Sequence, residues 1–279
     1  MPRAIQVEAR PDRTYHIPYS DGYLVYSSLL ENISTSDEDV SSHVHDTDFS
    51  SISVSSLSGN FKRSDRDGRK KIEPNESYRF QIGVTDPEEH EIYQSIVEPL
   101  VLENRDVEVG DSKLELQEFR SQEKGFEEIL DGAKEYDDPT IDMKFESPTC
   151  IKYGGSEVTE MFPHRTAVFG SILGKWNAAA PEELEIDLDR REIGGNLIEK
   201  PELRSLRTHS VRVNTVYDDE KGHERPIVRQ GFTGRCRYEF VGGVGEDLEK
   251  AVTALAIFGE YSGVGSAVAR GCGSVEVRT

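Results

Sequence analysis

The chain has 279 residues, which is enough for one large domain or two domains of ordinary size. It carries 33 Lys and Arg against 53 Asp and Glu, so its formal net charge is -20. No apolar run approaches the roughly 20 residues that span a bilayer, and the first residues lack the apolar core of a signal peptide. The composition therefore excludes a helical membrane protein, and we expect a cytoplasmic one.

The acidic charge has two interpretations. Only 12 of the cations are lysine and 21 are arginine, a balance typical of proteins from a halophile's salty cytoplasm. In 1 M salt the Debye length is about 3 Å, so net charge would say little about partners. The alternative is an ordinary acidic protein, whose charge would repel polyanions. The widely spaced Cys150, Cys236 and Cys272 predict a reducing environment without disulfides.

The first half of the chain predicts a strand, a helix, two strands, a helix and a strand, in that order. Apolar residues recur with a period of two in the strands and with the helical period in the helices. Asp86 and Pro87 form an N-cap and first-turn pair for the second helix. The predicted elements are the strands 4–10, 51–57, 77–84 and 107–119 and the helices 22–34 and 86–102.

The second half repeats this order after a polar stretch at 121–136. Its helices cover 164–178, with Val168, Ile172 and Trp176 on one face, and 246–261. Its strands cover 140–151, 205–216, 231–242 and 272–278. Each half fits the split βαββαβ pattern. We expect an α+β chain of two tandem ferredoxin-like (RRM-like) domains at 1–124 and 125–279, a fold that does not by itself fix function.

Four glycines lie close together between the last predicted helix and the last predicted strand: Gly263, Gly265, Gly271 and Gly273. A dinucleotide fingerprint is wrong for this segment, because a helix precedes it and Val268 stands where the third glycine is needed. A Walker phosphate loop is absent from the sequence. The segment is either a loop whose backbone amides approach phosphates, with Arg270 as a central cation, or a flexible connection.

The segment FGEYSGVGSAVARGCGSVEV resembles the C-terminal glycine-rich signature of the CRISPR repeat-processing endoribonucleases, a branch of the RAMP superfamily. FESPTCIKYGG, FPHRTAVFGSILGKWN and GFTGRCRYEF resemble the central strand, the central helix and the strand before the last helix of that family. YHIPYSDGYLVYSSLL and VHDTDFSSISVSSL are similar to its first helix and its histidine segment. These matches occur in the family's order over most of the chain.

The resemblance implies an endoribonuclease that binds the repeat of precursor CRISPR RNA and cuts it once, without metal or cofactor. The ribose 2′-hydroxyl would attack the neighbouring phosphate and leave a 2′,3′-cyclic phosphate and a 5′-hydroxyl. This chemistry needs a proton acceptor, a proton donor and stabilisation of the charged phosphorane. Histidine suits the proton transfers. His45, beside Asp46, falls at the family's histidine position and His43 is the second candidate; otherwise both are solvated loop residues.

The sequence departs from the family's pattern at two supporting positions. Several members have a tyrosine in the first helix and a lysine after the histidine. The matching positions here hold Leu29 or Leu30, and Phe49 or Ser50. The histidine would then act with Ser50, with cations such as Lys62 or Arg63, or with the geometry of the RNA itself. The alternative function is a non-catalytic RNA-binding subunit of a multi-subunit CRISPR effector complex.

Three basic clusters are candidate RNA contacts, at 62–71, 203–212 and 229–237. Lys62 and Arg63 stand in the first, which is equally a solvated turn between two strands. Arg235 and Arg237 stand in the third, where they share one face of a strand and either line the cleft between domains or form salt bridges. The single tryptophan, Trp176, is predicted in the core.

Overall fold

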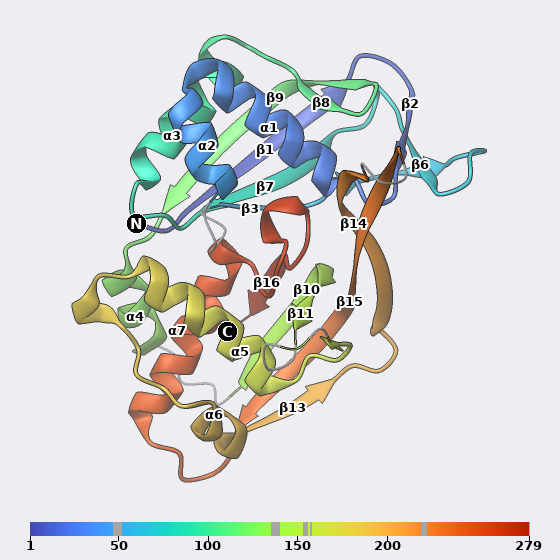
Figure 1. Ribbon diagram of the computed structural model, residues 1–279. Coiled ribbons are helices and arrows are strands. Elements are labelled where there is room, and N and C mark those ends of the chain that lie inside the picture. The colour runs from blue at the N-terminus through green and yellow to red at the C-terminus, as the bar shows by residue number, and fades with distance from the viewer. Residues whose placement is uncertain (47–51, 135–139, 153–155, 157, 219–221, 279) are drawn as a thin grey trace.

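The computed structural model describes residues 1–279 apart from 47–51, 135–139, 153–155, 157, 219–221 and 279 (Figure 1). Two ferredoxin-like domains follow one another along the chain, each with helices packed on an antiparallel sheet. Among the described helices, none is long and apolar enough to cross a membrane.

The N-terminal sheet has the strand order β3-β7-β1-β9-β8, in which β9, β1, β7 and β3 form the ferredoxin-like core. Helices α1 and α3 lie on one side of this sheet (Figure 1). The alternating buried residues of β1 and β7, such as Ile5 and Ile82, explain why these segments form central strands. The elements are β1 (Arg3–Pro11), α1 (Gly22–Ser36), β3 (Ile52–Val54), β7 (Tyr78–Val84), α3 (Glu89–Val97), β8 (Val107–Val109) and β9 (Ser112–Glu123).

Several short elements decorate this domain. A three-stranded sheet, β2-β6-β5, lies beside the main sheet, and a short helix, α2, follows α1 directly. The bounds are β2 (Tyr15–Pro18), α2 (Glu38–Asp46), β4 (Ser58–Gly59), β5 (Lys62–Arg63), β6 (Arg69–Ile72) and η1 (Glu98–Leu102). The last turn of α2 carries both candidate histidines, His43 and His45.

The C-terminal sheet has the corresponding order β13-β15-β10-β16. Its main elements are α4 (Phe126–Lys134), β10 (Thr140–Thr149), α5 (Arg165–Ala179), β13 (Leu197–Pro201), β14 (Arg207–Asp218), β15 (His223–Phe240), α7 (Glu246–Ser262) and β16 (Val275–Arg278). The shorter ones are β11 (Ile151–Lys152), β12 (Thr159–Glu160), η2 (Glu182–Leu184), α6 (Arg190–Asn196) and η3 (Val268–Arg270).

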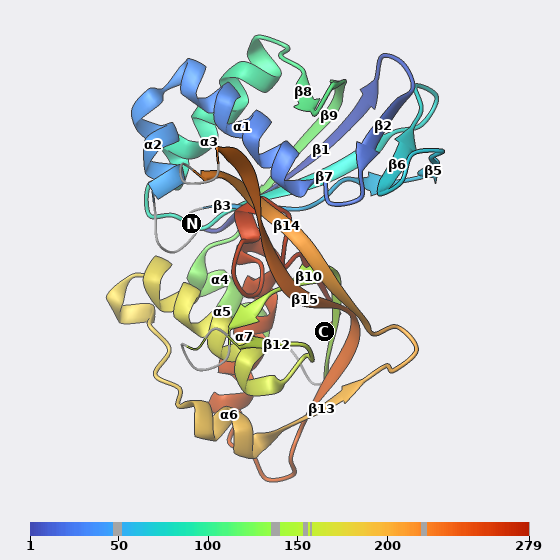
Figure 2. The ribbon, with the colours of Figure 1, turned by 45° about the vertical axis from the view of Figure 1, so that its right-hand side comes forward.

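The prediction that 205–216 supplies the second core strand of this domain is wrong. That place is taken by β13, which pairs with β15 from Leu197 to Pro201. Strand β14 instead pairs with the other part of β15 and forms a long two-stranded arm that reaches α1 of the N-terminal domain (Figure 2). Because both strands continue well past the sheet, local alternation could not distinguish an arm from a sheet strand.

Two further boundaries differ from the sequence prediction. Residues 107–119 form a hairpin of β8 and β9 rather than one strand, because the chain turns at Gly110 with a φ of 64°. Helix α3 begins at Glu89, three residues after Asp86. The Asp86 carboxylate still accepts a hydrogen bond from the Glu88 N–H at 2.9 Å, so it satisfies a backbone donor at the start of the helix.

Each domain has its own hydrophobic core. The C-terminal core confirms the predicted face of α5, since Val168, Ile172 and Trp176 are all fully buried. The Trp176 ring packs against the rings of Phe126 and Phe258, and its Nε1 donates to the Leu184 carbonyl at 2.8 Å. Phe126 comes from α4, so the segment after β9 already belongs to this core.

Candidate functional site

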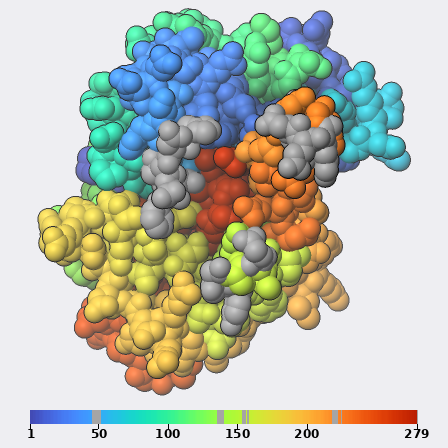
Figure 3. Space-filling view, viewed as in Figure 1, coloured from blue at the N-terminus to red at the C-terminus, as the bar shows by residue number. Residues whose placement is uncertain are grey.

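Residues 263–273, called here the glycine segment, connect α7 to β16. They reach the surface in the middle of one face, between the N-terminal domain, α5 and the β14–β15 arm (Figure 3). All four predicted glycines have positive φ, between 64° and 85°, which explains why glycine is required there. Ser266 is exposed and Arg270 is half-buried, whereas Gly263, Gly271 and Gly273 are buried.

Part of the glycine segment forms the contact between the two domains. The Cα of Gly271 faces the backbone of Gly22 at the start of α1 so closely that a Cβ at position 271 would lie 2.5 Å from the Gly22 Cα. The preceding helix end is held in the same way, because a Cβ at Gly83 in β7 would lie 1.8 Å from the Tyr261 carbonyl oxygen. The Ser53 hydroxyl donates to that oxygen at 2.7 Å. These glycines therefore allow the domains to meet backbone to backbone.

Most amides of the glycine segment donate within the protein. The N–H groups of Gly263, Gly265 and Gly273 donate to the Gly259 carbonyl, the Ser171 hydroxyl and the Pro148 carbonyl respectively. These three glycines thus shape the segment but do not offer free donors in this structure. The Arg270 guanidinium has no ion pair or hydrogen bond with any described residue, so it remains available to an anion.

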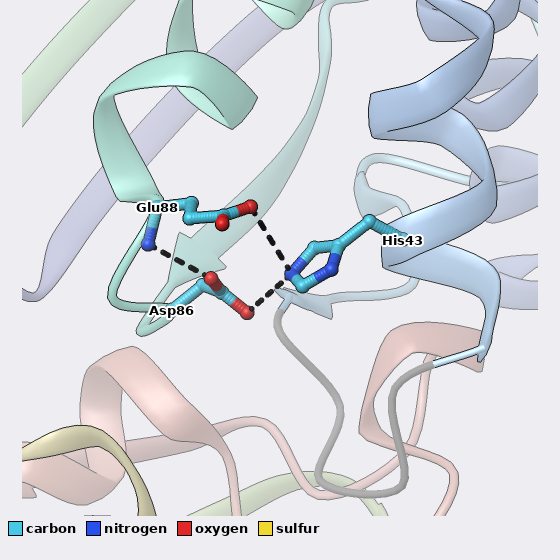
Figure 4. A group of neighbouring side chains, drawn as sticks. All are labelled: His43, Asp86 and Glu88. Atoms are coloured by element: carbon cyan, nitrogen blue, oxygen red, sulfur yellow. Dashed lines mark hydrogen bonds and ion pairs between the residues drawn. The ribbon is translucent and has the colours of Figure 1, made fainter.

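The two candidate histidines, His43 and His45, stand in the last turn of α2. The Nε2 atom of His43 lies 3.1 Å from Oδ2 of Asp86 and 3.8 Å from Oε2 of Glu88 (Figure 4). The Asp86 side chain is 5% exposed and that of His43 is 38% exposed. His43 therefore connects α2 to the start of α3. His45 stands two positions further along the same helix, and its side chain lies outside the described part of the structure.

Among the described residues, His43, Asp86 and Glu88 also form a group of three potential metal ligands, whose ligand atoms all lie within 4.8 Å of one another. Two observations disfavour a resident cation. Asp86 already accepts the Glu88 N–H, and the group lies at the N-terminal end of α3, where the helix dipole is positive. The arrangement is better suited to holding an imidazole in one orientation.

The residues of the first basic cluster have different roles. Lys62 and Arg63 lie in β5, are exposed and have no ion pair with a described residue. Lys70, in the same cluster, is buried, and its Nζ lies 2.8 Å from Oδ2 of Asp21. Burial raises the pKa of Asp21 while the neighbouring ammonium of Lys70 opposes that shift. Lys70 therefore fixes the start of α1, directly before Gly22, and is not a surface cation.

Arg235 lines a cavity of about 430 Å³ between the two domains. Its other walls are rich in hydroxyl groups, with Ser55, Ser56, Ser58, Ser147, Ser205, Thr233 and Ser274 among them. Sequence analysis missed these serines, because they come from separate segments and share no spacing. Arg237 is more exposed, and one of its guanidinium nitrogens lies 3.9 Å from Oδ2 of Asp142. At this arginine the structure therefore has the salt bridge that was the alternative to a place in the cleft.

A model of the family described as CRISPR-associated endoribonuclease Cas6 matches residues 143–275, which contain the whole glycine segment. A curated CRISPR-associated endoribonuclease Cas6 from Streptococcus thermophilus is 27% identical over 199 residues, which are 70% of this chain and 72% of that protein. The chain is therefore similar to Cas6 endoribonucleases over 70% of its length.

Solved Cas6 structures have the same fold over both domains. A Cas6 product complex is 19% identical, with a TM-score of 0.72, and the match covers 100% of both chains. The structure of a Cas6-related protein from Pyrococcus furiosus is 13% identical, with a TM-score of 0.67, and covers 100% of this chain and 99% of that one. The tandem ferredoxin-like architecture therefore extends over the N-terminal domain, which the family model does not match.

One departure from the expected Cas6 pattern has a structural explanation. Leu29, at the position where several members are expected to carry a tyrosine, is 1% exposed and packs in the N-terminal core. Leu30 is packed against the same core. Both positions of α1 therefore carry apolar core residues where a tyrosine was expected. The residues at the expected lysine position, Phe49 and Ser50, lie outside the described residues.

Proposed function

We propose that the protein is a metal-independent endoribonuclease that cleaves precursor CRISPR RNA within the repeat. The reaction forms a bond between the ribose 2′-oxygen and phosphorus and breaks the bond between phosphorus and the 5′-oxygen. It leaves a 2′,3′-cyclic phosphate and a 5′-hydroxyl, and it produces mature guide RNAs.

The match of the Cas6 family model to residues 143–275 carries this proposal, because that region contains the glycine segment. The product complex among the similar structures supports a role in RNA processing for that Cas6 protein and, by proposal, for this one. The free guanidinium of Arg270 at the surface of the segment supports contact with phosphate in an otherwise acidic protein.

We assign His45 the proton transfers at the 2′- and 5′-oxygens. His43 is less suited to this role because its Nε2 already contacts Asp86 and Glu88. Arg270 would stabilise the charge of the phosphorane. Arg235 and the serine-lined cavity, together with Lys62 and Arg63, would hold the repeat on either side of the cut. Gly263, Gly265, Gly271 and Gly273 then contribute to the RNA site by giving the segment its shape.

A non-catalytic RNA-binding subunit of a CRISPR effector complex remains the second candidate. The buried Leu29 favours it, because the supporting tyrosine expected of several Cas6 members has no equivalent there. The two candidates differ in one measurable property, which is cleavage of the bound repeat.

The test uses labelled repeat RNA in EDTA, with native protein, His45→Ala and His43→Ala. We expect single-site cleavage that survives EDTA and stops when the nucleotide at the cut carries a 2′-deoxyribose. The His45→Ala variant should cleave about 100-fold more slowly or worse, the usual contribution of a general acid or base. The His43→Ala variant is the matched control from the same helix and should lose less than about tenfold.

Two outcomes would contradict the proposal. If the native protein binds the repeat tightly without cutting it, the chain is a scaffold. If His43→Ala abolishes cleavage and His45→Ala does not, the histidines have the opposite roles.

A further inference from the structure

A cavity of about 460 Å³ opens on the C-terminal domain beside the glycine segment. Gly265 and Ser266 form one wall, and α5, α6 and the β11–β12 hairpin form the others. The charged residues that line it are Lys152, Arg190, Arg191 and Glu160. Three cations and one acid therefore line this space, which gives the lining a positive net charge in a chain whose net charge is -20.

The two arginines are held by a well-defined local structure. Helix α6 begins with a capping box, in which Asp189 accepts the Arg191 N–H at 2.8 Å and Glu192 accepts the Asp189 N–H at 2.9 Å. The Arg165 side chain donates to the Gly194 carbonyl at 2.9 Å and pairs with Glu199, so α6 is tied to α5 and β13.

Gly170 of α5 makes room for one of these arginines. A Cβ at this position would lie 3.3 Å from the Arg190 Nε, tighter than an ordinary contact. The Arg190 side chain therefore lies against the backbone of α5 at the cavity wall. Neither Arg190 nor Arg191 forms an ion pair or side-chain hydrogen bond with a described residue, although both are exposed.

The glycine segment forms a fixed wall of this cavity. The Gly265 N–H donates to the Ser171 hydroxyl at 2.8 Å, which leaves the Ser171 proton free to donate into the cavity. Gly265 has a φ of 85°, and a Cβ there would lie 2.5 Å from the Cys150 carbonyl oxygen. This wall of the cavity is thus held in place, because the backbone at Gly265 packs directly against the backbone at Cys150.

We propose that this cavity binds one backbone phosphate of the repeat RNA, outside the cut site, through Arg190, Arg191 and Ser171. A guanidinium matches two phosphate oxygens, and a neighbouring hydroxyl supplies a third hydrogen bond. The inference rests on the proposed function, because it assigns a second contact to the same RNA. A strand that crosses the exposed Ser266 passes from the face of Arg270 into this cavity.

The test measures the affinity of repeat RNAs that carry a 2′-deoxy nucleotide at the cut. Each RNA has one phosphate replaced by a neutral methylphosphonate, at successive positions. The proteins are native, Arg190→Ala/Arg191→Ala, the charge-retaining Arg190→Lys/Arg191→Lys, and Arg105→Ala as the control. Arg105 lies beyond α3 in the N-terminal domain and pairs with Glu103. Thermal unfolding establishes that each variant is folded.

We expect one methylphosphonate position to weaken native binding about tenfold and to have no further effect on the alanine double variant. The affinity of the lysine variant should lie between those of the native protein and the alanine double variant, and Arg105→Ala should bind as tightly as native protein. If the effects of the methylphosphonate and of the alanine substitutions on affinity multiply at every position, the cavity does not bind RNA. Cleavage of the all-ribose repeat by the native protein, measured separately, would then leave the proposed function intact. A coupled position in a protein that never cuts would overturn the proposed function alone, and failure of the native protein to bind the repeat would overturn both.

Discussion

At the scale of single residues, Lys175 of α5 is a half-buried lysine beside the site. Its Nζ donates to the Ser262 and Gly263 carbonyls at 3.0 and 2.9 Å, at the C-terminal end of α7. Desolvation of its amino group lowers the pKa of Lys175 to about 7, whereas an unfolded lysine has a pKa of about 10.4. The unfolded chain therefore binds more protons between these values, and stability should rise with pH across this window.

We predict that Lys175→Met removes this dependence. The free energy of unfolding, measured with denaturant between pH 7 and pH 9.5, should rise more for native protein than for the variant. Lys250→Met is the control, since Lys250 lies on α7 and pairs with Glu246 at the surface. If the free energy of unfolding changed with pH equally in native protein and in Lys175→Met, the prediction would be wrong.

Two cysteines that the sequence separates by more than a hundred residues are neighbours in the fold. The Sγ atoms of Cys150 and Cys272 are 3.9 Å apart, both side chains are buried, and Cys272 belongs to the glycine segment. Both are free thiols in this structure. Because a disulfide needs only a small approach of the two sulfurs, this pair should be the first to oxidise.

We predict that diamide, which takes two hydrogens from two thiols, joins Cys150 to Cys272. Thiol titration in denaturant should then fall from three per chain to one. The Cys150→Ser variant should keep both of its thiols under the same treatment. Three remaining thiols in the oxidised native protein would show that the pair does not form a bond.

At the scale of elements, the glycine segment joins α7 to β16 and also joins the two domains. Gly271 has a φ of 85° and touches Gly22, whereas Gly243 has a φ of 88° with nothing within 4 Å of a Cβ. The two positions share the same backbone strain and differ in the close approach. This makes Gly243 the matched control for Gly271.

We predict that Gly271→Ala destabilises the protein by about 2 kcal/mol more than Gly243→Ala. The control should lose about 1 kcal/mol, the cost of a left-handed alanine, while Gly271→Ala must also separate α1 from the glycine segment. Denaturant unfolding measures both values. Equal losses would mean that the domains tolerate a Cβ at their contact, and the RNA site would then be the main reason for glycine there.

At the scale of the whole molecule, the net charge of -20 raises the question of how it binds a polyanion. Many described cations are paired with carboxylates, such as Lys144 with Glu146 and Arg79 with Glu8. Arg270, Arg190, Arg191, Lys62 and Arg63 have no ion pair with a described residue, and Arg190 and Arg191 are proposed to share one phosphate. Binding should therefore depend on a small number of defined phosphate contacts and not on a broad positive surface.

We predict that the affinity for repeat RNA falls weakly with salt. The slope of log affinity against log KCl should correspond to about three phosphates, at roughly 0.7 per phosphate for a single strand. The measurement is a titration from low to molar KCl with uncleavable RNA, beside a basic RNA-binding protein as reference. A steep loss for this protein would show that diffuse electrostatic attraction dominates.

The sequence predicted most of the regular elements, because apolar residues in α5, α7 and the central strands follow the periods of helix and strand. It failed at β13 and β14, where pairing partners decide which strand enters the sheet. It also grouped Lys70 with the surface cations, since nothing in a run of charges reveals that one of them pairs with the buried Asp21. The roles of His45 and the RNA-binding residues remain predictions.

The sequence by itself determined the two ferredoxin-like repeats, the place of the glycine segment and the resemblance to an endoribonuclease family, because these depend on local period and on ordered motifs. Only the tertiary structure decided that Gly271 meets Gly22, that His43 contacts Asp86 and that Cys150 lies beside Cys272. The physical reason is that these contacts join residues tens to hundreds of positions apart. Such contacts are set by how each domain folds and by how the two domains pack together, so no short-range pattern in the sequence records them.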